Sequence, residues 1–176
     1  NKKIDGQLNP STEYFAIAFD SRNESGVVDI EVAKGGTGND TIIGGSATYS
    51  MEGGGGDDVI ISAHNSVNGD GAYHMRGDAG NDVLWSTADD RLYGGADSDT
   101  YWLNDSKAYD GNNSGTNTFF VYGGKSNSIT LAESLSDPYN TVQDTVKVFS
   151  GARASILFGG DNDVLMIGNT VISGTF

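Results

Sequence analysis

The chain has 176 residues and a formal net charge of −14, from 10 basic and 24 acidic residues. This excess of acid argues against nucleic acid or an anionic membrane surface as the partner. The absence of Cys excludes a disulfide framework, and no apolar run reaches the roughly 18 residues of a membrane span. The chain combines 26 Gly with seven Phe, eight Tyr and two Trp, which a disordered glycine linker would lack. The glycines must therefore serve a folded design that uses unusual backbone angles.

The first 34 residues differ from the rest because they lack glycine loops. Residues 14–19 and 27–32 are patterned as strands. We expect them to cap the exposed end of a stack of strands. The chain begins Asn1-Lys2-Lys3, without an initiator Met or a signal peptide. We therefore expect a monomeric module of a larger protein.

A nine-residue pattern, G-G-x-G-x-D-x-U-x with U a large apolar residue, recurs from residue 35 onward. Residues 35–43 and 53–61 fit it completely, residues 77–85 and 94–102 fit it with one Gly replaced by Asp, and residues 159–165 form a shortened copy. The Asp of the pattern falls at 40, 58, 82 and 99, in steps of 18, 24 and 17 residues. Eighteen residues make one coil of two strands. Asn117, Asp144 and Asp163 continue the series, which predicts seven coils.

A second set of short apolar segments lies half a coil away from these motifs. Residues 49–53, 73–77, 91–94, 120–123 and 156–159 each carry an apolar residue two positions before a Gly. This is the pattern of a short strand that turns into a glycine loop. The sequence thus predicts an all-β fold, a parallel β-roll or β-solenoid, in one domain over residues 1–176. Residues 1–34 would form the cap and 35–176 the solenoid, with its repeats clearest in 35–102 and 159–165.

Three segments interrupt the period, at 63–72, 104–114 and 133–142. They are predicted to be loops inserted into the coil, and loops of this kind are the parts of a solenoid most free to carry recognition. They are rich in Asn, Ser, Gly, Asp and Tyr, which offer adaptable hydrogen bonds and flat aromatic faces.

The glycine–aspartate turns have the chemistry of a calcium site. Gly tolerates positive φ, so its turns can direct backbone carbonyls inward, and the Asp adds a carboxylate. Ca²⁺ takes six to eight oxygen ligands and accepts carbonyls and carboxylates together. One turn cannot surround the ion, but two turns stacked one coil apart can. Zinc and copper are disfavoured, since there is no Cys and only two His, His64 and His74. Several Ca²⁺ ions are therefore expected along the stack.

The nonamers resemble those of the RTX family, whose repeats form calcium-binding β-rolls. The resemblance is strong for residues 35–61, good for 77–102 and weak beyond 105. It implies carbonyl ligands from the glycines of the turns, carboxylate ligands from the sixth-position Asp residues, and added or replacing ligands where Asp departs from the pattern. The implied metal-site residues are Gly36, Gly38, Asp40, Gly54, Gly56, Asp57, Asp58, Asp78, Gly80, Asp82, Gly95, Asp97, Asp99, Asp161 and Asp163.

Other side chains invite chemical roles but have plainer explanations. Asp57 and Asp58 could pair as glycosidase carboxylates, yet neighbours on a strand point to opposite faces. His74 is interpreted as a surface strand residue. Trp85, Tyr101 and Trp102 could stack on sugars, but we expect such aromatics to fill the core of a narrow roll. No catalytic residue is predicted.

These features favour a calcium-dependent ligand-binding module, which resembles in scale the binding domains of large RTX adhesins. The resemblance implies secretion to the bacterial cell surface by a type I system, and a peptide or carbohydrate ligand on another surface. The low overall basicity favours a neutral glycan or a peptide carboxylate. The alternative is an accessory domain of a secreted epimerase, lyase, lipase or protease. A free-standing polysaccharide enzyme is disfavoured, because such enzymes use basic residues that this chain has in small number.

Overall fold

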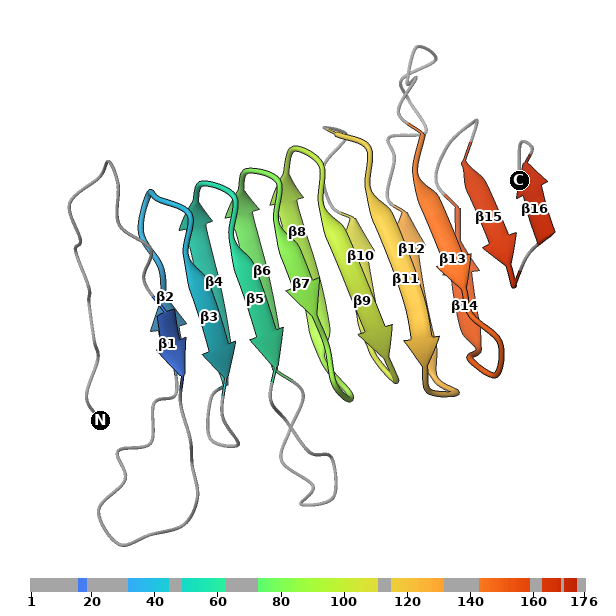
Figure 1. Cartoon of the computed structure of the whole chain (residues 1–176), viewed down its shortest axis with the longest axis horizontal. Coiled ribbons are helices and arrows are strands. Elements are labelled where there is room, and N and C mark those ends of the chain that lie inside the picture. Colours follow the sequence, from blue (N-terminus) through green and yellow to red (C-terminus); the bar gives the residue numbers. More distant parts are fainter. Residues whose placement is uncertain are drawn as a thin grey trace, which may run out of the picture.

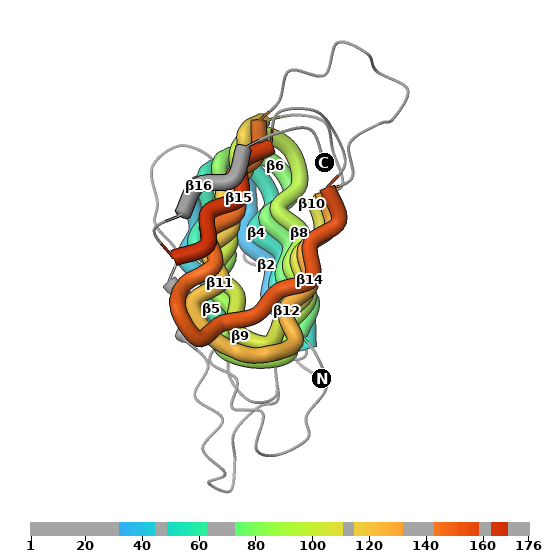
Figure 2. The backbone as a smooth tube through the Cα atoms, turned by 90° about the vertical axis from the view of Figure 1, so that its right-hand side faces the viewer, coloured from blue at the N-terminus to red at the C-terminus, as the bar shows by residue number. Residues whose placement is uncertain are grey.

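The computed structural model describes residues 16–18, 32–44, 49–62, 73–110, 115–131, 143–158, 163–168 and 170–173. In this part of the chain the fold is all-β, and the predicted parallel β-roll is confirmed. Figure 1 shows the strands standing side by side along the molecule, with the odd-numbered strands in front and the even-numbered strands behind, except that β16 follows β15 at the end of the front sheet. Figure 2 looks along this stack and shows a flattened coil, whose two sheets face each other and are joined by turns at two edges.

The chain alternates between the two sheets, one strand in each per coil. In the described residues, neighbouring strands pair parallel except the last two strands of the larger sheet, which pair antiparallel. The nine strands of sheet A are β1 (Ala16–Ala18), β3 (Thr41–Gly44), β5 (Val59–Ser62), β7 (Val83–Trp85), β9 (Thr100–Asn104), β11 (Thr118–Gly123), β13 (Thr145–Val148), β15 (Val164–Ile167) and β16 (Thr170–Ser173). The seven strands of sheet B are β2 (Val32–Lys34), β4 (Ser50–Gly55), β6 (His74–Ala79), β8 (Arg91–Ala96), β10 (Lys107–Asp110), β12 (Asn127–Leu131) and β14 (Ala154–Leu157).

Inward side chains from both sheets fill the core. The burial of the strands alternates, as period-2 geometry requires. Sheet A contributes among others Ile60, Leu84 and Phe119, and sheet B contributes Met75 and Leu92, all 0% exposed. The coil is so narrow that the inward side chains of the two sheets pack directly on each other. The longer strands β9, β11 and β12 each bury a second apolar residue, Leu103, Val121 and Leu131.

The outer face of sheet A carries an aromatic column that we expected in the core. Trp85 is 39% exposed and its ring stacks on Trp102 at 5.0 Å between centroids. The ring of Trp102 stacks in turn on Phe120 at 4.3 Å. The prediction that Trp85, Tyr101 and Trp102 fill the roll is wrong for both tryptophans and confirmed for Tyr101. The strands alternate, and the inward positions belong to Leu84 in β7 and Tyr101 in β9, which are both fully buried.

The predicted insertion at 104–114 is also wrong in part. Residues 107–110 form β10, which pairs in register with β8 and β12 as a regular rung of sheet B. The period was hidden because the turn before β10 is short. The predicted loops at 63–72 and 133–142 lie outside the described residues, as does most of the predicted cap. Of the cap, β1 and β2 are described, and they are the first strands of sheets A and B.

Within the described residues no helix is long and apolar enough to cross a membrane. His74 lies on the outer face of β6, as predicted for a surface strand position.

Candidate metal site

One side chain from each coil forms a buried polar row at the edge where sheet B turns into sheet A. Each member directly precedes a strand of sheet A. The Oδ1 atom of one member accepts the backbone N–H of the member one coil earlier, at 2.7–3.1 Å throughout the row. We call this row the carboxylate ladder. Its members are Asp40, Asp58, Asp82, Asp99, Asn117, Asp144 and Asp163.

The ladder explains why the sequence steps are irregular while the structure is regular. Successive members are 18, 24, 17, 18, 27 and 19 residues apart, yet every member occupies the same place in its coil. A short side chain that bonds to a nearby backbone N–H satisfies a donor that the turn would otherwise leave unpaired. Extra residues are therefore placed elsewhere in the coil.

The second carboxylate oxygen of the ladder is the unusual atom. Oδ2 is buried and has no hydrogen-bond partner in Asp58, Asp82, Asp99, Asp144 and Asp163, whose side chains are at most 2% exposed. A buried carboxylate oxygen without a partner is costly unless it is protonated or meets a cation. The ladder therefore presents a row of unsatisfied oxygens along one inner edge of the roll.

Burial raises the pKa of these carboxyls well above the ordinary value of 3.8. The pKa of Asp58 is raised to about 7, that of Asp82 to about 6 and that of Asp99 to about 7. Repulsion by neighbouring carboxylates adds to the effect of burial, while the backbone hydrogen bond at Oδ1 opposes it. Without a cation, the ladder thus holds its protons into the neutral range.

The first glycine of each motif leaves room for these oxygens. A Cβ added to Gly53, Gly77 or Gly94 would overlap Oδ2 of the ladder carboxylate in its own coil, and would also crowd backbone oxygen or the Tyr101 hydroxyl. Carbonyl oxygens of the next coil lie against Gly53 and Gly77 as well. The glycines thus bring backbone oxygens and ladder oxygens together in a space that a side chain would fill.

The other glycines of the motif let the turns stack closely. Gly54, Gly56, Gly80 and Gly95 have φ between 105° and 123°, a region that L-residues rarely adopt. A Cβ added at any of these four positions would overlap backbone carbonyl atoms of the preceding coil. At Gly56, the atoms in question are those of Gly38.

The structure separates the predicted carboxylate ligands into two groups. The sixth-position Asp residues lie in the buried ladder. Asp57, Asp78 and Asp97 are instead exposed on the outside of the turns. Asp78 and Asp97 adopt positive φ, 75° and 73°, at positions where other coils have Gly. Asp57 accepts a hydrogen bond from the backbone of Asn81 at 2.8 Å. Asp161 lies outside the described residues.

The structure adds ligand candidates that the site prediction missed. Asp144 is fully buried within the ladder, and burial together with the neighbouring Asp110 carboxyl raises its pKa to about 8. Asp110 ends β10 in register with the first-glycine position of the previous coil, and it too is buried. In the coil of Asp110 the ladder position is taken by Asn117. This coil therefore carries its carboxylate before the turn, whereas the other coils carry it after the turn. The sequence predicts Asp144 as a member of the series, but no glycine turn directly precedes it, so the nine-residue pattern does not mark it as a ligand.

The opposite edge uses the same device with mostly neutral side chains. The Oγ atom of Ser106 accepts the backbone N–H of Asp90 at 3.1 Å, and Oδ1 of Asn127 accepts that of Ser106 at 3.1 Å. The Nδ2 of Asn127 donates to two backbone carbonyls. Asp90 is the charged exception at this edge: its Oδ2 accepts from the hydroxyls of Ser62 and Ser86, while its buried Oδ1 accepts no hydrogen bond. The other five such oxygens in the described residues belong to the ladder edge.

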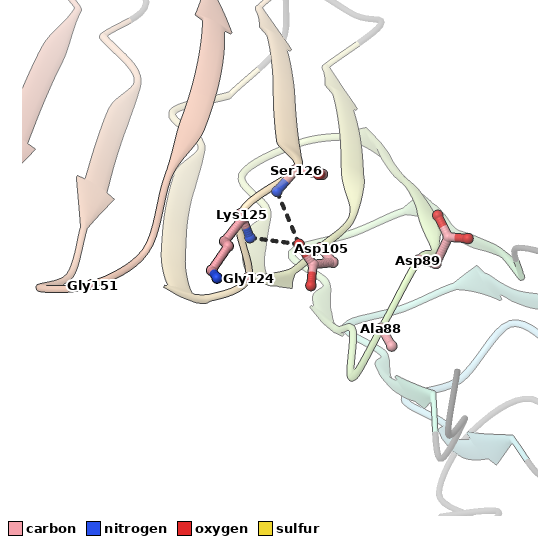
Figure 3. Close-up of a pocket in the computed structure, with 7 residues that line it drawn as sticks. All are labelled: Ala88, Asp89, Asp105, Gly124, Lys125, Ser126 and Gly151. Carbon is pink, nitrogen blue, oxygen red and sulfur yellow. Dashed lines mark hydrogen bonds between the residues drawn. The ribbon is translucent and has the colours of Figure 1, made fainter. Parts of the chain in front are cut away.

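An open pocket of about 600 Å³ lies between the turns of this neutral edge. Figure 3 shows Asp105 accepting the backbone N–H groups of Lys125 and Ser126, while Asp89 points away from it. The two carboxylates therefore do not converge on one position, and the pocket has no arrangement that would hold an ion between them.

No group of three or more His, Asp or Glu side chains converges closely enough to hold a metal by side chains alone in the described residues. An ion at the ladder would need backbone oxygens as well, which is the mixed oxygen set that Ca²⁺ accepts. No protein-family model matches the chain, and no curated protein or solved structure is significantly similar to it.

Proposed function

We propose that this chain is a calcium-dependent β-roll module of the RTX kind. The observation that carries the proposal is the row of buried ladder oxygens without partners, placed against glycine turns that supply backbone oxygens. All available ligands are oxygen atoms, which suits a hard cation and not zinc or copper. The nonamer resemblance supports the same ion.

The ladder residues Asp58, Asp82 and Asp99 would hold calcium through Oδ2, together with carbonyls of the glycine turns. Bound Ca²⁺ would supply positive charge to a row of buried carboxylates. The ladder residues themselves keep the coils in register through Oδ1, which stays bonded to the backbone. Each carboxylate would thus join two neighbouring coils and one ion, which couples folding to calcium.

The biological role that we propose is recognition outside the cell. Calcium is scarce inside bacterial cells and abundant outside, so a chain of this kind would remain unfolded until export and then form a rigid scaffold. We propose a secreted or surface-attached binding module that recognises a ligand on another surface, and not an enzyme. The buried carboxylates with raised pKa values face the core edge of a stacked coil rather than a cleft where a substrate could reach them.

A calcium titration tests the proposal. Circular dichroism of the chain in chelator should show a largely unfolded or molten state, because the ladder carboxylates repel one another when they ionise. Added Ca²⁺ should produce the β-sheet spectrum and raise the thermal midpoint, and Mg²⁺ at equal concentration should do so far less, since it demands tighter octahedral geometry. A midpoint that chelator leaves unmoved would contradict the calcium assignment.

A further inference from the structure

The basic side chains of this acidic protein gather on the outer face of sheet B. Four of the exposed or half-buried strand residues there are Lys or Arg, against two acidic ones in the described strands, Glu52 in β4 and Asp78 near the end of β6. Glu52 forms an ion pair with Lys34 at the start of the sheet. Along the central strands β6, β8 and β10, the cations Arg76, Arg91 and Lys107 lie before the turns, and the exposed acid of these strands, Asp78, lies where β6 enters its turn. We call this central area the cationic face, made of His74, Arg76, Arg91, Tyr93, Lys107 and Tyr109.

The cations of this face form no ion pair within the described residues, although Glu52 is the cross-strand neighbour of Arg76. Within the described part of the chain, Arg76, Arg91 and Lys107 form no ion pair, although the protein carries 24 acidic residues against 10 basic ones. Arg91 bonds to the ring of His74 at 3.2 Å, and the guanidinium of Arg76 lies over the ring of Tyr93 at 5.7 Å. Arg91 and Lys107 are direct neighbours in register with no acid between them, and this local concentration of positive charge would attract an anionic ligand.

The parallel register places these groups in rows across the strands. His74, Arg91 and Lys107 are direct neighbours on three adjacent strands. Adjacent strands lie about 4.8 Å apart, so the row repeats a polar or charged group at that interval along the axis of the roll. The rings of Tyr93 and Tyr109 stack beside the row at 5.1 Å. The face is therefore a flat strip with a short, regular repeat.

We propose that the cationic face binds a linear anionic polysaccharide, whose carboxylate or sulfate groups lie on Arg76, Arg91 and Lys107. The chain of the ligand would run along the axis of the roll, since the strand spacing is close to the length of one sugar ring in a linear glycan. This proposal rests on the proposed binding function and assigns its ligand class. It also departs from the neutral ligand that overall composition favours, because the few cations are concentrated in one place.

Other polyanions fit this face less well. An extended acidic peptide presents same-side residues about 6.6 Å apart, which does not match the spacing of the row. Nucleic acid and an anionic bilayer are extended surfaces of charge, and the net charge of −14 would repel them over the rest of the molecule.

The aromatic column on sheet A is a weaker glycan platform. A sugar stacks on the face of an aromatic ring, but the rings of Trp85, Trp102 and Phe120 stack on one another, at 14° and 15° between planes. Their faces are thus covered by neighbouring rings, and they present edges to solvent. The column stabilises the sheet and leaves recognition to the other side of the roll.

The test uses the whole chain in calcium and oligomers of polygalacturonate as the probe. Isothermal titration should show binding that weakens as NaCl is raised. The triple variant Arg76→Gln, Arg91→Gln, Lys107→Gln should bind roughly 10- to 100-fold more weakly. The matched control Lys125→Gln, Lys147→Gln, Arg153→Gln removes the same charge from the turns and sheet A, and should bind like the original chain.

Each outcome decides the matter. Equal affinity of the two triple variants would overturn the proposal, as would equal binding to neutral dextran. Equal binding to polyglutamate of the same charge would show a general anion site and overturn the polysaccharide assignment. The calcium-dependent thermal midpoint is measured for each variant. If calcium raises the thermal midpoint of the original chain but the chain does not bind polygalacturonate, only the ligand proposal fails. If calcium leaves the thermal midpoint of the original chain unchanged, the proposed function fails.

Discussion

The two oxygens of Asp58 have separable tasks, and two substitutions at this residue distinguish them. Oδ1 accepts the buried N–H of Asp40 at 2.7 Å, and Oδ2 has no partner. Asp58→Ala removes both oxygens. Asp58→Asn keeps an oxygen for the N–H, as Asn117 shows by accepting the N–H of Asp99 at 2.7 Å in the same ladder. The Asn variant therefore removes only the charge that calcium would meet.

The expected magnitudes follow from these contacts. In saturating calcium, Asp58→Ala should be less stable than Asp58→Asn by about 1–3 kcal/mol, the cost of leaving a buried N–H unpaired. For a chain of this length that corresponds to a thermal midpoint about 2–12 °C lower. The gap between the original chain and Asp58→Asn should depend on calcium, reaching roughly 2.7 kcal/mol when free calcium is 100 times the dissociation constant of the lost site.

Thermal melts by circular dichroism at several free calcium concentrations, with bound calcium counted by elemental analysis, provide the assay. Both variants should bind fewer ions than the original chain. If Asp58→Asn binds as many ions and melts at the same temperature at every calcium concentration, Oδ2 is not a ligand. If Asp58→Ala and Asp58→Asn melt together, the hydrogen bond at Oδ1 contributes little. Asp89→Asn, in an exposed turn of the opposite edge, is the control for lost charge.

Three further outcomes are expected. In chelator the fold should become more stable as pH falls from 8 towards 5. The carboxyls of Asp58, Asp82 and Asp144 have pKa values of about 6 to about 8 in the folded chain, against 3.8 in the unfolded chain. Their contribution to stability is therefore complete below pH 3.8 and is lost as pH rises through the folded pKa values. Circular dichroism against pH should show this, and Asp99→Asn should reduce it. Gly54→Ala should cost about 1–3 kcal/mol or more, since φ is 110° and the Cβ would overlap a carbonyl, whereas Gly55→Ala, whose nearest atom is 3.8 Å away, should cost little in the same denaturant melt. Trp102→Ala should lower stability by about 1–3 kcal/mol, because two stacked rings each lose a partner; an unchanged melting midpoint would contradict a stabilising aromatic column.

The sequence by itself determined the architecture. The nonamers place Asp40, Asp58, Asp82 and Asp99 at equivalent points of successive coils, and the structure confirms that they share one edge. Period-2 alternation on either side of the glycine turns was enough to predict two parallel sheets. These signals are local, because each coil repeats the same short-range chemistry of glycine turn, carboxylate and strand.

Only the tertiary structure decided which side chains face solvent and which carboxylates lie together. Trp102 and Tyr101 are adjacent in sequence and opposite in location, and composition cannot tell which of them faces inward. Asp110 and Asp144 meet because the coil brings strands of different sheets to one edge, across a sequence gap with no motif. The cations on sheet B likewise come from separate coils. Such clustering arises from register across the sheets, and register depends on the turn lengths of every coil, which the repeat pattern does not encode.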